Sequence, residues 1–110
     1  MAIKNKAASA KIKMQIIERQ GADLRKALIE QMRSGGLRTF VTEKHGKKVR
    51  HTSADYPGWM NWSYDAGVIT CLFLSPKKPG KEWKLFHAFL GRLADRFVNQ
   101  IHSINIQFVD

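Results

Sequence analysis

The residues best suited to chemistry are cations and aromatic rings that crowd between positions 38 and 59. Five of these cations would line one hairpin: Arg38, Lys44, Lys47, Lys48 and Arg50. Tyr56 and Trp59 follow that hairpin directly. Lysine and arginine bind phosphate oxygens, and aromatic faces stack on unpaired bases. The stretch therefore predicts contact with a nucleic acid, with single strands favoured because their bases are free to stack.

A second group of cations follows the apolar run VITCLFL at 68–74. The next residues, SPKKPGK, combine prolines and a glycine with the lysines Lys77, Lys78 and Lys81. Proline and glycine interrupt regular structure, so this segment is expected to be an exposed loop. Its lysines would add further contacts to phosphates.

The pleat of a strand over 59–64 would divide the aromatic residues between two faces. Met60, Trp62 and Tyr64 share one face, and Trp59 shares the other with Asn61 and Ser63. The first set is more apolar, so Trp62 is expected in the core and Trp59 on a surface where a base could stack. Trp83 would open the second helix on its apolar stripe and is also expected in the core.

One catalytic alternative is a metal-independent ribonuclease, which needs a base, an acid and phosphate-binding cations. The stretch KHGKKVRHTSADY supplies such groups in His45, Lys47, Lys48, Arg50, His51 and Tyr56. In a regular strand, however, Arg50 and His51 point to opposite faces and do not converge. The chain is therefore expected to bind its partner without catalysing a reaction.

Other chemistry finds little support in the sequence. The nine acids are spread along the chain, and the four histidines show no metal-ligand spacing. Glycine-rich phosphate motifs are absent, so neither a metal nor a cofactor is expected. Cys71, the single cysteine, lies in the most apolar run and is expected to be an inert core thiol.

The overall charge points to a polyanionic partner. Lys and Arg number 19 against 9 Asp and Glu, which gives a formal net charge of +10. Residues 56–76 contain no cation, so the positive charge belongs to the segments on either side. Such a surface attracts nucleic acid. An acidic protein surface would be attracted in the same way, so a small inhibitor or adaptor is the alternative from another class.

Hydrophobic periodicity predicts an α+β fold with the order α-β-β-β-β-α-β. Strands are expected over 39–42, 49–53, 59–64 and 68–74, a second helix over 81–99, and a last strand where Ile104, Ile106 and Phe108 alternate with polar residues. The sheet would be mainly antiparallel with two helices on one face. The run 68–74 would be central and covered on both faces.

Residues 7–33 are predicted to form one long first helix. They are rich in helix formers, contain no proline, and carry an apolar stripe from Met14 to Met32. The stripe is longer than one small sheet would cover, so a homodimer through this helix is expected. Residues 1–6 would precede it as a flexible basic arm.

We therefore expect a single domain over 1–110. It would be a small basic nucleic-acid-binding protein, without catalytic activity. No apolar run has the length of about 20 residues that a membrane span requires. The lone cysteine fits a reducing compartment, and the expected location is the cytoplasm.

Overall fold

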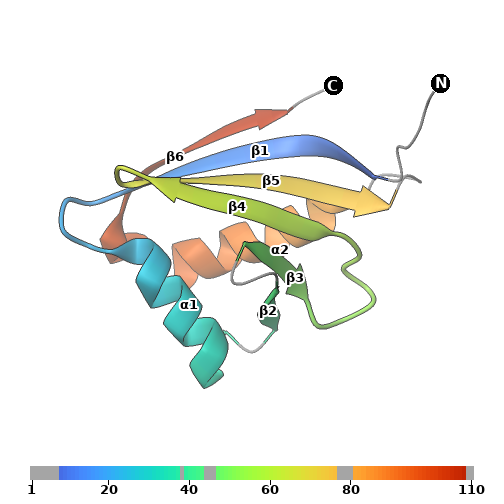
Figure 1. Ribbon diagram of the computed structural model, residues 1–110, viewed down its shortest axis with the longest axis horizontal. Coiled ribbons are helices and arrows are strands. Elements are labelled where there is room, and N and C mark those ends of the chain that lie inside the picture. Colours follow the sequence, from blue (N-terminus) through green and yellow to red (C-terminus); the bar gives the residue numbers. More distant parts are fainter. Residues whose placement is uncertain (1–7, 38, 44–46, 77–80, 109–110) are drawn as a thin grey trace.

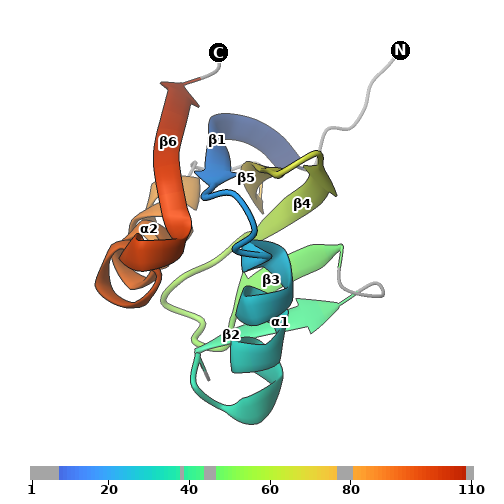
Figure 2. The ribbon, with the colours of Figure 1, turned by 90° about the vertical axis from the view of Figure 1, so that its left-hand side faces the viewer.

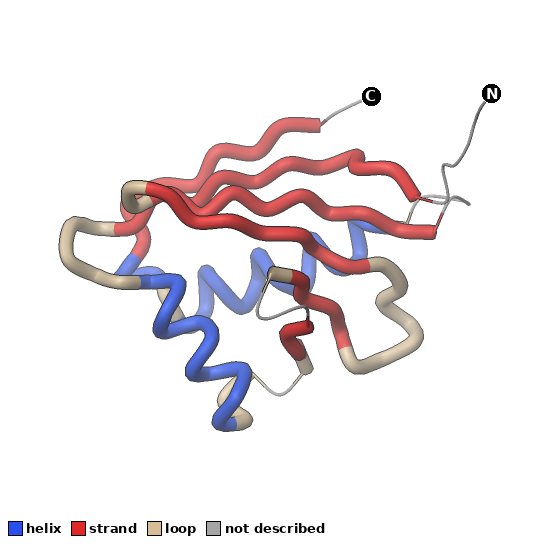
Figure 3. Tube along the Cα trace, in the orientation of Figure 1, coloured by secondary structure: helices blue, strands red, loops and turns tan. Residues whose placement is uncertain are grey.

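The computed structural model describes residues 8–37, 39–43, 47–76 and 81–108 (Figure 1). They form one antiparallel six-stranded sheet and two α-helices, which confirms the α+β prediction. The elements are β1 (Ala8–Glu18), α1 (Leu24–Ser34), β2 (Phe40–Glu43), β3 (Lys48–His51), β4 (Trp59–Asp65), β5 (Val68–Pro76), α2 (Glu82–Arg96), the short 3₁₀ helix η1 (Val98–Gln100) and β6 (Ile101–Phe108). In space the strands follow the order β2-β3-β4-β5-β1-β6, as the trace in Figure 3 shows.

The prediction of one helix over 7–33 is wrong in its first half. Residues 8–18 form β1, which lies between β5 and β6 and pairs antiparallel with both. Ile12, Met14 and Ile16 are buried while Lys13 and Gln15 between them are half-buried, a period of two rather than 3.6. Backbone pairing on both sides outweighs the helix propensity of this segment, which is only a weak preference.

Helix α1 begins at Leu24 after a turn in which Gly21 and Asp23 adopt left-handed backbone angles. Asp23 does not cap the helix with its side chain. Instead, the Leu24 backbone N–H donates to Glu18 Oε1 at 2.9 Å, so a carboxylate at the end of β1 satisfies one free donor of the first turn. Glu18 Oε2 also accepts from the Tyr64 hydroxyl at 2.8 Å, which ties the start of α1 to β4.

The apolar side of α1 is covered within its own chain. Leu24 and Leu28 are fully buried and Met32 is 8% exposed. The stripe that suggested a dimer through this helix is therefore divided between a strand and a short helix, and both halves contribute to one core. The physical basis for a dimer at this place is removed.

One side of the sheet carries the hydrophobic core. Alternate residues of β1, β4 and β5 point into it and meet Leu85, Phe89 and Leu93 of α2. Both helices lie on this side of the sheet, below β4, β5 and β1 in the view of Figure 1. Trp62 is 4% exposed and packs edge-on against Phe89, with ring centroids 6.3 Å apart, so its predicted place in the core is confirmed.

Strand β5 is central, as predicted, because it lies between β4 and β1. Cys71 on its helix side is fully buried, and burial raises the pKa of its thiol well above the usual value. The expectation that β5 is covered on both faces is wrong. Leu72 is 36% exposed, and no described element lies over its side of the sheet (Figure 2).

Candidate nucleic-acid interface

We call the side of the sheet opposite the helices the open face. Its side chains alternate with the buried positions of each strand, and strand register places them in rows across the sheet. They are Lys13, Gln15 and Ile17 of β1, Val41 and Glu43 of β2, Lys48 and Arg50 of β3, Trp59, Asn61, Ser63 and Asp65 of β4, Val68, Thr70, Leu72 and Leu74 of β5, and Ser103, Asn105 and Gln107 of β6. The face is largely polar, with amides, hydroxyls, a few cations and two acids, and it also carries aliphatic side chains of β1, β2 and β5.

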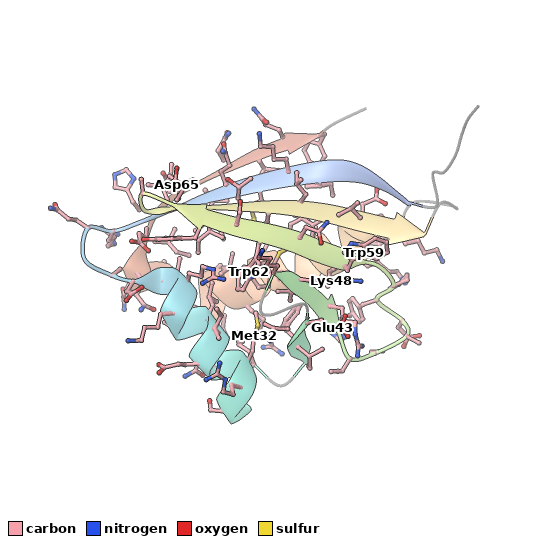
Figure 4. All side chains as sticks on the ribbon, viewed as in Figure 1. Met32, Glu43, Lys48, Trp59, Trp62 and Asp65 are labelled. Atoms are coloured by element: carbon pink, nitrogen blue, oxygen red, sulfur yellow. The ribbon has the colours of Figure 1, made fainter. Side chains whose placement is uncertain are left out.

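The most distinctive feature of the open face is a pair formed by Trp59 and Lys48. Lys48 Nζ lies 4.7 Å from the centroid of the Trp59 ring, within the range of a cation–π contact. Trp59 is half-buried and opens β4, where it pairs with Leu74. Figure 4 shows the two side chains together at the end of the sheet away from the β4–β5 turn, which Asp65 marks. The predicted assignment of Trp59 and Trp62 to opposite faces is confirmed.

Gly58 sets the way the chain enters β4 at Trp59. Its φ is +100°, a left-handed conformation that favours glycine. A Cβ atom at this position would lie 2.2 Å from the backbone oxygen of Leu74. The loop before β4 therefore runs against the end of β5, where Trp59 pairs with Leu74.

Lys48 and Lys13 occupy one cross-strand row. Glu43 pairs with Lys48, Lys48 with Asn61, Asn61 with Leu72, Leu72 with Lys13, and Lys13 with Gln107. At about 4.8 Å between strands, the Cα atoms of the two lysines are roughly 14 Å apart. The next row holds Ser63, Thr70, Gln15 and Asn105. The row that contains the two lysines thus lies beside a row of neutral hydrogen-bonding groups.

Arg50 lies on the open face beside Lys48 but is engaged with an acid. Its Nε lies 2.6 Å from Glu43 Oε2 on the neighbouring strand, and both side chains are partly exposed. This ion pair partly neutralises a cation that the sequence suggested for phosphate binding. Lys47 is exposed, and its backbone oxygen accepts from the Trp62 N–H.

Tyr56 is separated from Trp59. Its ring stacks on His51, with centroids 4.2 Å apart and an interplanar angle of 15°. His51 in turn contacts the buried Phe40 edge-on, so this aromatic group belongs to the helix side. Tyr56 there lines an open groove of about 480 Å³ with His87 and Arg92 of α2. The two aromatic residues predicted to stack on bases therefore cannot act on one surface.

The surroundings of His51 favour its neutral form. Its Nδ1 accepts the backbone N–H of Ser53 at 2.9 Å, so the proton of the neutral form lies on Nε2. Burial lowers the pKa of His51 below its usual 6.5, and the positive charge of Arg92 lowers it further. Strand register puts Arg50 on the open face and His51 on the helix side, as the alternation predicts.

The start of α2 carries a second aromatic and cationic pair, which the sequence pattern does not predict. Trp83 is 52% exposed, so its predicted burial is wrong, and Lys84 Nζ lies 5.9 Å from its ring centroid. The reason is Glu82, which is 6% exposed and accepts from Ser75 Oγ at 2.6 Å. Fixing Glu82 inward rotates Trp83 outward by about 100°, one residue of an α-helix.

Lys81 is exposed directly before α2, and its backbone N–H donates to Ser75 Oγ. Ser75 follows Leu74, the partner of Trp59, so this cluster lies at the same end of the sheet as the Trp59–Lys48 pair. Four further predicted contacts lie outside the described residues: Arg38, Lys44, Lys77 and Lys78. Within the described ranges, no group of three or more His, Cys, Asp or Glu side chains could hold a metal ion.

Comparison with known proteins adds no family to this description. The chain matches no protein-family model, no curated protein and no solved structure. Across the part of the chain that is described, no helix is long and apolar enough to cross a membrane.

Proposed function

We propose that the chain binds nucleic acid, preferring single strands, across the open face of its sheet. The observation that carries this proposal is the Trp59 ring held on the open face with the Lys48 ammonium 4.7 Å above it. A base stacked on Trp59 would bring its phosphate within reach of a cation that is already in place. Stacking on an aromatic ring typically contributes ~1–3 kcal/mol per base.

The surroundings of this pair support the same ligand. Lys13 lies in the same cross-strand row as Lys48, and neutral amides and hydroxyls fill the next row. Phosphates need cations, whereas exposed base edges accept and donate hydrogen bonds. A basic chain with a largely polar, helix-free sheet face offers both.

The test measures the affinity of labelled single-stranded oligonucleotides by fluorescence anisotropy. Trp59→Ala should weaken binding by ~1–3 kcal/mol through loss of the stacking ring. Lys48→Gln should weaken it more than Lys26→Gln, which removes the same charge from an exposed position on α1. His51→Ala should leave binding unchanged because that ring lies on the helix side.

Two results would contradict this proposal. If wild-type protein shows no binding at low salt, the class of partner is wrong, and an acidic protein surface becomes the better candidate. If Lys48→Gln and Lys26→Gln weaken binding equally, attraction is diffuse and the open face is not the site. Cleavage of RNA in the presence of a chelator, lost on His51→Ala, would instead favour a metal-independent ribonuclease.

A further inference from the structure

Among the described strands, the outer edge of β6 is a free sheet edge. β6 is the last strand in the order β2-β3-β4-β5-β1-β6, and its neighbour is β1. No other described strand pairs with its outer side. A free edge presents unpaired backbone N–H and C=O groups, which form a template for another strand.

This edge lacks most of the features that usually prevent such pairing. Residues 101–108, IHSINIQF, contain no lysine, arginine, acid or proline. The strand has eight residues, whereas β2 at the opposite edge has four. Its register with β1 is regular from Phe108 to Ser103 and shifts only near its start. Long, uncharged and regular edges are the ones that pair.

Apolar side chains add to the exposed backbone. Phe108 is 76% exposed, more than any other large hydrophobic residue described. Ile104 and Ile106 lie on the helix side of β6, where they are only partly buried against the core. A strand added beside β6 would cover this row.

We propose that β6 pairs antiparallel with β6 of a second copy of this chain, joining two six-stranded sheets into one. Two identical antiparallel edges are related by a two-fold axis perpendicular to the sheet, so each copy supplies what the other needs. The absence of charge also favours a second copy as the occupant. Two chains of net charge +10 repel each other, and β6 is a long edge at which they meet without opposing cations.

In the register that we infer, Asn105 faces Asn105 of the second copy. Ile104 then lies opposite Ile106 on the helix side, and Ser103 lies opposite Gln107 on the open face. Phe108 comes beside His102. Placing Ile104 on the axis instead would set Phe108 against Gln100, which belongs to η1 and not to the strand. This inference does not depend on the proposed nucleic-acid ligand.

Sedimentation of the wild-type protein at high micromolar concentration is the first test. We expect a mass of twice 12.6 kDa. Asn105→Lys should give a monomer because it brings two like charges together at the axis. The matched control is Ser63→Lys, which adds the same charge to an exposed position of the same face on β4 and should remain a dimer. Circular dichroism checks that both variants are folded.

A cysteine at the axis provides the second test. Cβ atoms directly opposite in an antiparallel pair are about 4.5–5.5 Å apart, close enough for a disulfide after slight adjustment. Asn105→Cys should therefore form a covalent dimer on mild oxidation, and Ser63→Cys should not. Cys71 does not compete because it is fully buried. A wild-type protein that sediments as a monomer would overturn the proposal. So would a dimer that persists in the Asn105→Lys variant and forms no disulfide in the Asn105→Cys variant.

Discussion

Trp59 and Trp62 are three residues apart in one short strand, yet their environments differ completely. Trp62 lies under the helices, where Phe89 packs against its edge and Arg25 lies 5.7 Å above its ring. Trp59 lies on the open face with Lys48 above it. The pleat of β4 explains the difference, because an odd separation sends two side chains to opposite faces.

Trp62→Ala should lower the free energy of unfolding by about 3–5 kcal/mol, since it empties a large volume in the core. Trp59→Ala should cost far less, because its ring is half-buried and lies outside the core cluster. Urea denaturation followed by circular dichroism measures both. Equal losses for the two variants would contradict the division of the strand into a buried and an open face.

His51 should make stability depend on pH. Its folded pKa is lowered by burial and then by Arg92, whereas the unfolded chain keeps a pKa of about 6.5. The unfolded state therefore takes up a proton first, so this contribution is present above about pH 6.5 and is lost as pH falls toward the folded pKa.

Replacing His51 by Asn should reduce the loss of stability on acidification, because the side chain no longer titrates while its amide oxygen can still accept the Ser53 N–H. Urea unfolding at neutral and mildly acidic pH measures the difference. A nuclear magnetic resonance titration that gave His51 a pKa of 6.5 or higher would contradict this account.

At the scale of elements, the two halves of the segment 7–33 show that helix propensity alone does not determine secondary structure. Both halves consist largely of residues that favour helices, and only the second half becomes one. The signal for a strand was present in the alternation of Ile12, Met14 and Ile16 with Lys13 and Gln15. Composition obscured it, since Ala, Lys, Gln and Met all rank high in helix propensity.

The start of α1 depends on a side chain from the preceding strand. Glu18→Ala should destabilise the protein by about 1 kcal/mol, the usual cost of losing an N-terminal cap. Glu18→Gln should cost less because its amide oxygen can still accept from the Leu24 N–H. Thermal unfolding compares the variants with Glu30→Ala, an exposed position on the same helix. Similar losses for Glu18→Ala and Glu30→Ala would refute the capping role.

The same carboxylate acts on β4 through Tyr64. The hydrogen bond to Glu18 raises the pKa of the Tyr64 hydroxyl, with smaller contributions from desolvation and nearby acids. The bond is therefore fully present below pH 10, the usual tyrosine pKa, and is lost as the pH rises through the raised value. Helix start and strand end are joined by one acidic group in this way.

At the scale of the molecule, added salt should weaken the proposed binding of nucleic acid but should not weaken the proposed self-association. Affinity for an oligonucleotide should fall steeply as salt rises, because each phosphate contact releases counterions. Self-association through β6 should hold or strengthen, since salt screens the repulsion between two chains of net charge +10. Anisotropy and sedimentation over one salt series measure both. Parallel weakening of the two would contradict an uncharged dimer interface.

Much of this protein is determined by its sequence alone. The hairpin of β2 and β3, strands β4 and β5 and helix α2 follow from short-range periodicity and turn residues, which act between neighbours in the chain. The burial of Trp62 and Cys71 follows from the same patterns, because alternation and apolar runs directly report which face a residue occupies.

Only the tertiary structure decided the rest. Residues 8–18 became a strand because β5 and β6, far away in sequence, offered two edges to pair with. Tyr56 lies apart from Trp59 because its ring stacks on His51 and lines a groove beside α2 on the helix side. Trp83 is exposed because the preceding residue, Glu82, is held on the buried side of α2 by its hydrogen bond from Ser75. In each case the deciding contact joins different elements of the fold, so the local pattern around the residue does not contain it.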